Sequence, residues 1–156
     1  MTKVRLRDGK VALKDGMIYL GSDELDDRPC KCCAEECGTL TVTVEWCGMT
    51  VTKVVPIPGT SANFGLPDAS LPDGSYMYVS VGIGCTPCGW QVGIGICAGC
   101  EATNQFTGES WEALVPFSDT PEAGGGYCPE PGAVALTCFG DQFGIPCVTN
   151  AAATIA

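Results

Sequence analysis

The sequence predicts an all-β protein, an antiparallel β-sandwich stapled by cysteines and preceded by a short N-terminal β-hairpin arm. Three observations predict this fold. The chain has 156 residues, of which 21 are glycine and 11 proline, and this composition favours short strands and many turns. Segments of alternating hydrophobicity recur along it, whereas no run of ten residues has helical periodicity. Its twelve cysteines amount to about 8% of the residues, close to the level of disulfide scaffolds.

The centre of the predicted sandwich is the stretch from Tyr76 to Cys100, YMYVSVGIGCTPCGWQVGIGICAGC. It is typical of two strands joined by a tight turn, because Val and Ile alternate with small residues on both sides of the turn. The segment VGIG occurs twice, at 81–84 and 92–95. Its glycines leave one face of the hairpin nearly bare, which usually indicates another backbone packed close over that face.

Further strands are expected on both sides of this hairpin. Residues 38–46 and 49–57 alternate apolar and polar side chains around a Cys47-Gly48 turn, and residues 61–71 predict an irregular loop. The expected elements after the hairpin are a polar loop at 101–110, strands at 111–117 and 133–139, and a short C-terminal strand. About seven body strands at irregular spacing favour two packed antiparallel sheets.

Residues 1–29 form a separate arm and linker in this prediction, and residues 30–156 form the body. VRLRDGK at 4–10 is followed by VALKDGM at 11–17 and then by IYL. Asp-Gly between alternating residues is a strong hairpin signal, so this repeat predicts three very short strands. They are too small to be stable alone and are expected to pack on the body or, as we favour, on another subunit. Residues 21–29 predict a solvated acidic linker rather than a calcium site, because their spacing matches no EF-hand loop.

Charge is distributed unevenly along the chain. The net charge is −10, yet seven of the eight basic residues lie in the first 31 positions. After Lys53 there is no Lys or Arg, so the body cannot neutralise phosphates and nucleic-acid binding is not expected. Two interpretations of this charge distribution remain open. In the first, the acidic charge only keeps the body soluble. In the second, the basic arm docks on an acidic neighbour.

Several classes of function are disfavoured by what the sequence lacks. It contains no His, which removes the usual general base, the nucleophile pairs that use His, and His metal ligands. No stretch of 18 residues is continuously apolar, so no membrane span is expected. The start, MTKVRLRDGK, lacks the apolar core of a secretory signal, and synthesis in the cytoplasm is therefore expected.

The cysteines admit disulfides, metal ligands or free thiols, and we favour disulfides. The two Cys-x-x-Cys pairs, at 85–88 and 97–100, have zinc-like spacing. A strand between them would separate the pairs by roughly 30 Å at about 3.3 Å per residue, too far for one tetrahedral site. Neither pair begins a helix as a thioredoxin-like redox motif does. The disulfide candidates are Cys30, Cys32, Cys33, Cys37, Cys47, Cys85, Cys88, Cys97, Cys100, Cys128, Cys138 and Cys147.

The two ends of the central hairpin are expected to be cross-linked to different regions. The turn end would reach the 30–37 cluster or Cys47, and the far end would reach the loops that contain Cys128 and Cys147. The metal alternative would require each Cys-x-x-Cys pair to recruit ligands from elsewhere, such as the 30–37 cluster.

Several segments follow one another in a recognisable order. They are a basic start with LRDGK and LKDG, a cysteine cluster, an alternating TLTVTVEWCG, a GWQVGIGI segment, a late CPEPG and a short terminal strand. Together they resemble the cysteine-rich small structural proteins encoded in phage and prophage morphogenesis regions. The resemblance covers most of the chain as a pattern and brings no catalytic signature. It implies a virion surface component, made in the host cytoplasm and oxidised after lysis.

Three functions are therefore weighed. The first is a non-enzymatic structural protein of a tailed bacteriophage particle, either a capsid decoration (cement) protein or a tail or fibre component. It would bind neighbouring capsid or tail subunits, form a homo-oligomer and need no cofactor. The expected anchoring residues in the arm are Val4, Arg5, Leu6, Arg7, Lys10, Val11, Leu13, Lys14, Ile18 and Leu20.

The second function is a carbohydrate- or receptor-binding module with an aromatic stacking surface, and the third is a cysteine-ligated metal protein. The aromatic candidates are Tyr76, Tyr78, Trp90, Trp111 and Tyr127, for each of which core packing is the commoner role. Catalysis would depend on scattered carboxylates in which no acid–base pair is fixed, namely Asp68, Asp73, Glu109 and Glu112. We therefore expect no enzymatic activity.

Overall fold

The computed structural model describes residues 12–14, 17–19, 32–140 and 146–156. The chain divides into two units, Met1–Cys30 and Lys31–Ala156. In its described residues, the second unit, which we call the body, contains strands joined by loops and one turn of 3-10 helix at Glu101–Thr103. Its strands form two antiparallel sheets, which confirms the predicted fold class.

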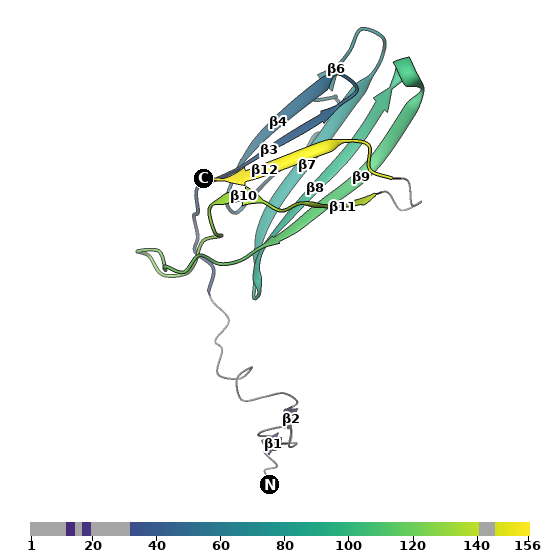
Figure 1. Cartoon of the computed structure of the whole chain (residues 1–156). Coiled ribbons are helices and arrows are strands. Elements are labelled where there is room, and N and C mark those ends of the chain that lie inside the picture. The colour runs from purple at the N-terminus through teal and green to yellow at the C-terminus, as the bar shows by residue number, and fades with distance from the viewer. Residues whose placement is uncertain (1–11, 15–16, 20–31, 141–145) are drawn as a thin grey trace. The chain divides into compact units, whose positions relative to one another are not determined.

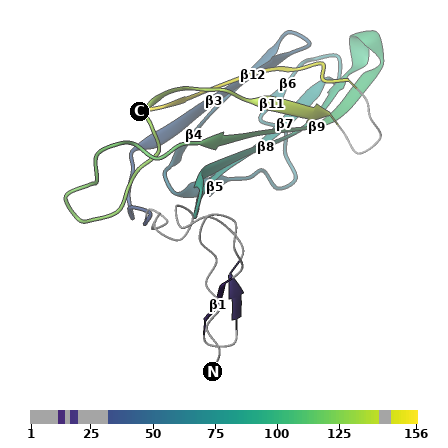
Figure 2. The ribbon, with the colours of Figure 1, turned by 60° about the horizontal axis from the view of Figure 1, so that its bottom comes forward.

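The two sheets of the body lie in two layers, as Figures 1 and 2 show. The strand order of the four-stranded sheet is β10 (Gly132–Val134), β12 (Asn150–Ile155), β3 (Thr39–Trp46) and β4 (Met49–Pro56). The order of the six-stranded sheet is β11 (Thr137–Gly140), β9 (Gln105–Val115), β8 (Gly89–Cys100), β7 (Tyr76–Thr86) and β5 (Gly59–Ser61), with β6 (Ala69–Ser70) also paired to β7.

The core lies between the sheets and follows from the period of two along each strand. On β3, Leu40, Val42 and Val44 are completely buried, while the threonines between them face outward. The predicted central hairpin is confirmed as β7 and β8, whose Val and Ile side chains face this core. Burying each such side chain stabilises the fold by about 1.5–3 kcal/mol.

Two sequence predictions about the second half of the body are wrong. The expected polar loop at 101–110 contains the first half of β9, which begins at Gln105. Polar Thr107 and Glu109 occupy its inward positions, so no apolar alternation marked this half as a strand. The expected strand at 133–139 is two strands, because the chain leaves the four-stranded sheet after Val134 and joins the six-stranded sheet at Thr137.

Short strands also interrupt a region predicted to be irregular. The expected loop at 61–71 contains β6, and β5 ends at its first residue. Both pair with β7, so they widen the six-stranded sheet at the edge opposite β11.

In the first unit, β1 (Ala12–Lys14) pairs antiparallel with β2 (Met17–Tyr19). Leu13 and Ile18 are register partners in this pair. Two of the three short strands predicted for the arm are therefore present. The strand expected near residue 4 and the acidic linker at 21–29 lie outside the described residues.

Candidate functional site

Four disulfides cross-link the body. Cys47, in the turn between β3 and β4, is bonded to Cys100 at the end of β8, with the two Cα atoms 5.9 Å apart. This bond joins one sheet to the other. The remaining bonds are Cys33–Cys85, Cys37–Cys128 and Cys138–Cys147, with Cα separations of 6.1, 5.3 and 6.4 Å.

The pairing confirms one of the two expectations for the central hairpin. Its turn end is joined to the 30–37 cluster through Cys33–Cys85, as predicted. Its far end is joined to Cys47 and not, as expected, to the loops that contain Cys128 and Cys147. The physical reason is that the β3–β4 turn lies at the same end of the sandwich as the last residue of β8. The two Cys-x-x-Cys pairs lie at opposite ends of the β7–β8 ladder, as the strand-length argument predicted.

Three disulfide candidates are not bonded in the described part of the chain. Cys32 and Cys88 are exposed thiols that flank the Cys33–Cys85 bond in the sequence. Cys97 is exposed on β8, on the face of the sheet that points away from the core. Cys30 lies outside the described residues.

The middle of the outer face of the six-stranded sheet is rich in glycine. The glycines of the central hairpin point to this face, and Gly82 and Gly93 are direct cross-strand partners. A Cβ atom added at Gly84, Gly93 or Gly108 would meet no atom within 4 Å. We call this surface the glycine face. The sequence predicts another backbone packed over these glycines, and the described residues of this chain do not supply it at Gly84, Gly93 or Gly108.

Large apolar side chains stand around these glycines. Phe106 and Leu114, on β9, are 53% and 54% exposed, and Phe139, on β11, is 63% exposed. Glu112 is the single carboxylate that β7, β8 and β9 direct to this side. The glycine face thus combines a bare floor with apolar rims and little charge.

Two tyrosines lie at one end of the glycine face. The rings of Tyr76 and Tyr78 meet edge to face with centroids 5.3 Å apart. Beside Tyr78, a hollow of about 320 Å³ is lined also by Asn63, Ser80 and Cys97. Burial raises the pKa of the Tyr76 phenol above its usual value, and the nearby Cys97 thiol raises it further.

The other aromatic candidates are not part of this surface. Trp90 is completely buried, and its Nε1–H donates to the carbonyl oxygen of Tyr127 at 3.2 Å. Trp111 packs against the core from β9. Tyr127 lies in the loop after β9 and makes an edge-to-face contact with Phe117. The five aromatic residues therefore do not form one stacking surface, because alternate strand residues face opposite ways.

The carboxylates named as catalytic candidates are also separated. Asp68 forms an ion pair with Lys53, whose Nζ also donates to Asn63 Oδ1 at 2.8 Å. Asp73 accepts a hydrogen bond from the backbone N–H of Ser75 at 3.0 Å, which lowers the pKa of Asp73. Glu112 is exposed on the outer face of β9 and Glu109 is buried on its inner face.

Of the arm residues expected to bind a partner, the structure describes only three. Leu13 and Lys14 belong to β1 and Ile18 belongs to β2. The other seven lie outside the described residues, namely Val4, Arg5, Leu6, Arg7, Lys10, Val11 and Leu20.

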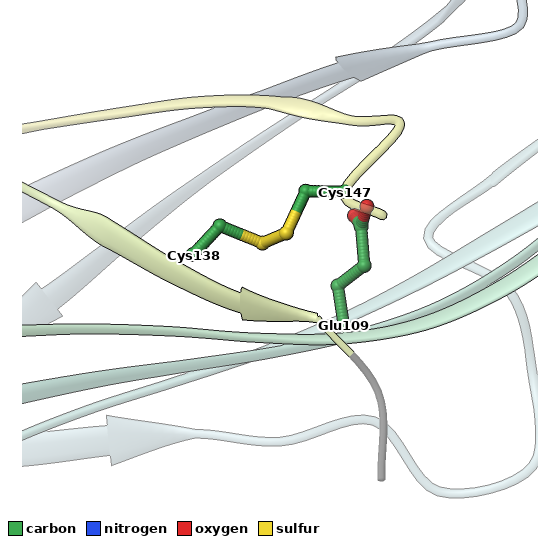
Figure 3. A group of neighbouring side chains, drawn as sticks. All are labelled: Glu109, Cys138 and Cys147. Carbon is green, nitrogen blue, oxygen red and sulfur yellow. A yellow bond between two sulfur atoms is a disulfide. The ribbon is translucent and has the colours of Figure 1, made fainter. Parts of the chain in front are cut away.

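Glu109 and the Cys138–Cys147 disulfide form a cluster that was not predicted from the sequence (Figure 3). One carboxylate oxygen of Glu109 and the two sulfur atoms all lie within 4.8 Å of one another. Glu109 is only 4% exposed. Its oxygens accept hydrogen bonds from the backbone N–H groups of Val148 and Thr149 and from the Thr149 hydroxyl. The one available signal was a Glu at an inward position of an alternating segment, T-x-E-x-W-x-A-x-V.

Comparisons with protein-family models, curated proteins and solved structures find no match to this chain. In the part of the chain that the structure describes, no helix has the length and apolar character needed to cross a bilayer.

Proposed function

We propose that this chain is a non-enzymatic structural protein on the surface of a tailed bacteriophage particle, a capsid decoration protein or a tail or fibre component. In this proposal its N-terminal unit anchors it to neighbouring subunits and it acts as a homo-oligomer. The observation that carries the structural role is the uncovered glycine face. The assignment to a phage particle rests on the order of sequence segments that resembles phage structural proteins.

The two outer faces of the sandwich differ in a way that supports burial of the glycine face in an assembly. The outer face of the four-stranded sheet is rich in threonine, with Thr43 and Thr52 hydroxyls 3.4 Å apart, and it also exposes Val54. Such a surface is well solvated. The glycine face instead exposes backbone, tyrosines and large apolar side chains, and contiguous apolar surfaces of this kind mark interaction sites.

The size of the glycine face fits a protein–protein contact. Strands β7, β8 and β9 contain 11, 12 and 11 residues. At about 3.3 Å per residue and about 4.8 Å between strands, they present roughly 500 Å². Strands β5 and β11 extend this area towards the roughly 800 Å² per partner of a standard interface.

The charge distribution supports different roles for the arm and the body. Residues 32–156 contain one basic and twelve acidic side chains, whereas residues 1–20 contain five basic and two acidic ones. Acidic bodies repel one another, and a basic arm that reaches a neighbouring body offsets this repulsion. The cross-links suit a protein that persists outside a reducing cell.

The proposal is tested by incorporation into particles. Purified particles from cells that carry the gene region are expected to contain the chain, as mass spectrometry would detect. Deleting residues 1–20 should abolish incorporation while the body remains folded. Normal incorporation of the truncated chain would refute anchoring by the arm. Absence of the full chain from all particles would refute the phage role.

The glycine face has its own matched test. Gly93→Gln places a neutral side chain where a Cβ meets no atom within 4 Å, so the isolated body should fold normally. Thr52→Gln places the same side chain on the other sheet's outer face. We expect Gly93→Gln alone to reduce incorporation. Equal incorporation of the two variants would show that the glycine face is not part of the interface.

A second candidate function is a carbohydrate- or receptor-binding module. The pair of tyrosines beside the 320 Å³ hollow favours it, because aromatic rings and nearby amide and hydroxyl groups are typical of sugar sites. A glycan screen in which wild type binds and Tyr78→Ala does not would support this function. A screen without hits would count against it.

A further inference from the structure

Among the residues that the structure describes, no basic side chain forms an ion pair with the buried carboxylate of Glu109. Residues 32–156 contain a single cation, Lys53, and it is paired with Asp68. In the described ranges, the donors that reach Glu109 belong to Val148 and Thr149. A buried carboxylate is costly unless charge or hydrogen bonds compensate it, and the compensation from the described residues consists of hydrogen bonds. The site can therefore accept positive charge.

Two further polar atoms of β9 lie buried without a partner in the described structure. They are Thr107 Oγ1 and Trp111 Nε1. Both residues lie on the inward face of β9, two positions before and two positions after Glu109, and Thr107 is only 6% exposed. Unsatisfied buried polar groups in a native fold need an explanation, such as water or an ion. The inward face of β9 therefore has unused hydrogen-bonding groups on both sides of Glu109.

The sulfur atoms of Cys138 and Cys147 complete a set of three ligands with Glu109. Within the described ranges this is the one group of three such ligand atoms that lie within 4.8 Å of one another. In a tetrahedral zinc site with Zn–S bonds of about 2.3 Å, two sulfurs are about 3.8 Å apart. Cα atoms 6.4 Å apart can serve either a disulfide or such a pair. Cys147 lies outside the strands, so its side chain can make the small shift.

We propose that Cys138, Cys147 and Glu109 form a redox-gated zinc site, of which the Cys138–Cys147 disulfide is the oxidised form. Two thiolates and one carboxylate favour zinc over hard cations such as magnesium. Water would occupy the fourth position, as it does in zinc sites with three protein ligands. This inference goes beyond the proposed function and does not depend on it.

The exchange between the two forms is balanced. A dithiol reductant transfers two electrons and two protons to the disulfide, which yields the Cys138 and Cys147 thiols while the reductant becomes a disulfide. Zinc binding then displaces the two thiol protons into solvent. In the reverse direction, a low-molecular-weight disulfide takes two electrons from the two zinc-bound thiolates. The Cys138–Cys147 bond forms, zinc is released, and the oxidant leaves as two thiolates.

The test compares zinc bound per chain in the full-length protein, reduced with a phosphine and desalted without oxygen. Because other thiols also bind zinc when reduced, the informative quantity is a difference between variants. Reduced wild type should retain one more zinc ion than Cys138→Ser/Cys147→Ser by elemental analysis. Reduced Cys37→Ser/Cys128→Ser, which removes a cysteine pair without a carboxylate, should retain as many as wild type. Equal zinc in wild type and Cys138→Ser/Cys147→Ser, or the same loss in both double variants, would overturn the proposal.

Glu109 is tested by affinity rather than by stoichiometry. In competition with a chromophoric chelator, Glu109→Gln should bind the site's zinc at least tenfold more weakly than wild type. Cobalt(II) gives a second readout, because thiolate coordination produces charge-transfer absorption that Cys138→Ser/Cys147→Ser should lose in part. Far-ultraviolet circular dichroism of the oxidised variant controls for folding. Unchanged zinc affinity in a folded Glu109→Gln, or cobalt spectra that do not differ between wild type and the double variant, would refute the assignment.

Discussion

Removal of the Cys37–Cys128 disulfide is predicted to destabilise the body more than removal of Cys138–Cys147. The first pair is separated by 91 residues and the second by nine. Other bonds shorten the larger loop. With Cys47–Cys100 intact, only residues 37–47 and 100–128 remain in it, so its effective length is about 38 residues. Loop-closure entropy then gives about 3.9 kcal/mol for Cys37–Cys128 and about 2.6 kcal/mol for Cys138–Cys147.

The measurement is urea unfolding of the oxidised Cys37→Ala/Cys128→Ala and Cys138→Ala/Cys147→Ala variants, after peptide mapping has shown that the three other bonds are intact. The free energy of unfolding should fall by about 4 and about 2.6 kcal/mol respectively. The two variants should therefore differ by about 1.3 kcal/mol in free energy of unfolding. A loss for Cys138→Ala/Cys147→Ala that equals or exceeds the other would refute the reasoning from loop length.

Three other predictions concern the core, the glycine face and the thiols. Leu40→Ala, at a fully buried site, should lower the free energy of unfolding by about 2–5 kcal/mol. Thr41→Ala, on the opposite face of β3, should change it by less than about 0.5 kcal/mol, and equal losses would contradict the assignment of faces. Because the pKa of Tyr76 is raised from about 10, its contribution to stability is fully present below pH 10 and is lost as pH rises through the folded-state pKa. Absorbance titration of wild type against Tyr76→Phe measures this, and a Tyr76 phenol that titrates at or below pH 10 would disprove it. Alkylation without reductant should modify the three exposed thiols and none of the bonded cysteines in the body, as peptide mass spectrometry would show, and modification of a bonded cysteine would contradict the pairing. The expected sites are Cys32, Cys88 and Cys97.

The parts of the fold that sequence predicted are those where apolar residues alternate without interruption. Leu40, Val42 and Val44 mark β3 because each inward position is apolar, and the central hairpin is marked in the same way. The first half of β9 was missed because Thr107 and Glu109 take inward positions, and a polar residue there removes the signal. The alternation of apolar and polar residues also does not indicate which sheet a strand joins. The segment that changes sheets after Val134 was therefore predicted as one strand.

The candidate site was less predictable than the fold, because the residues that contact one another in it are far apart in the sequence. The spacing of two Cys-x-x-Cys pairs excluded a shared metal site, since β8 separates them. Nothing in the sequence around Glu109, whose neighbours are Gly108 and Ser110, indicates that its carboxylate contacts the segment around Thr149. The bare glycine face was recognised from sequence. That nothing in the described chain covers it depends on the whole topology.

The contribution of each disulfide to stability relates the proposed zinc site to the proposed structural role. Three bonds span 52, 91 and 53 residues and hold the ends of the sandwich. The fourth spans nine residues, so it restricts the unfolded chain least and its reduction costs the fold least. This least stabilising bond is also the one beside the buried carboxylate of Glu109. In this proposal, a chain that folds first under reducing conditions loses less stability by keeping Cys138 and Cys147 as zinc ligands than it would by leaving any of the other three pairs unbonded. The same chain gains its long-range bonds when it meets an oxidising milieu.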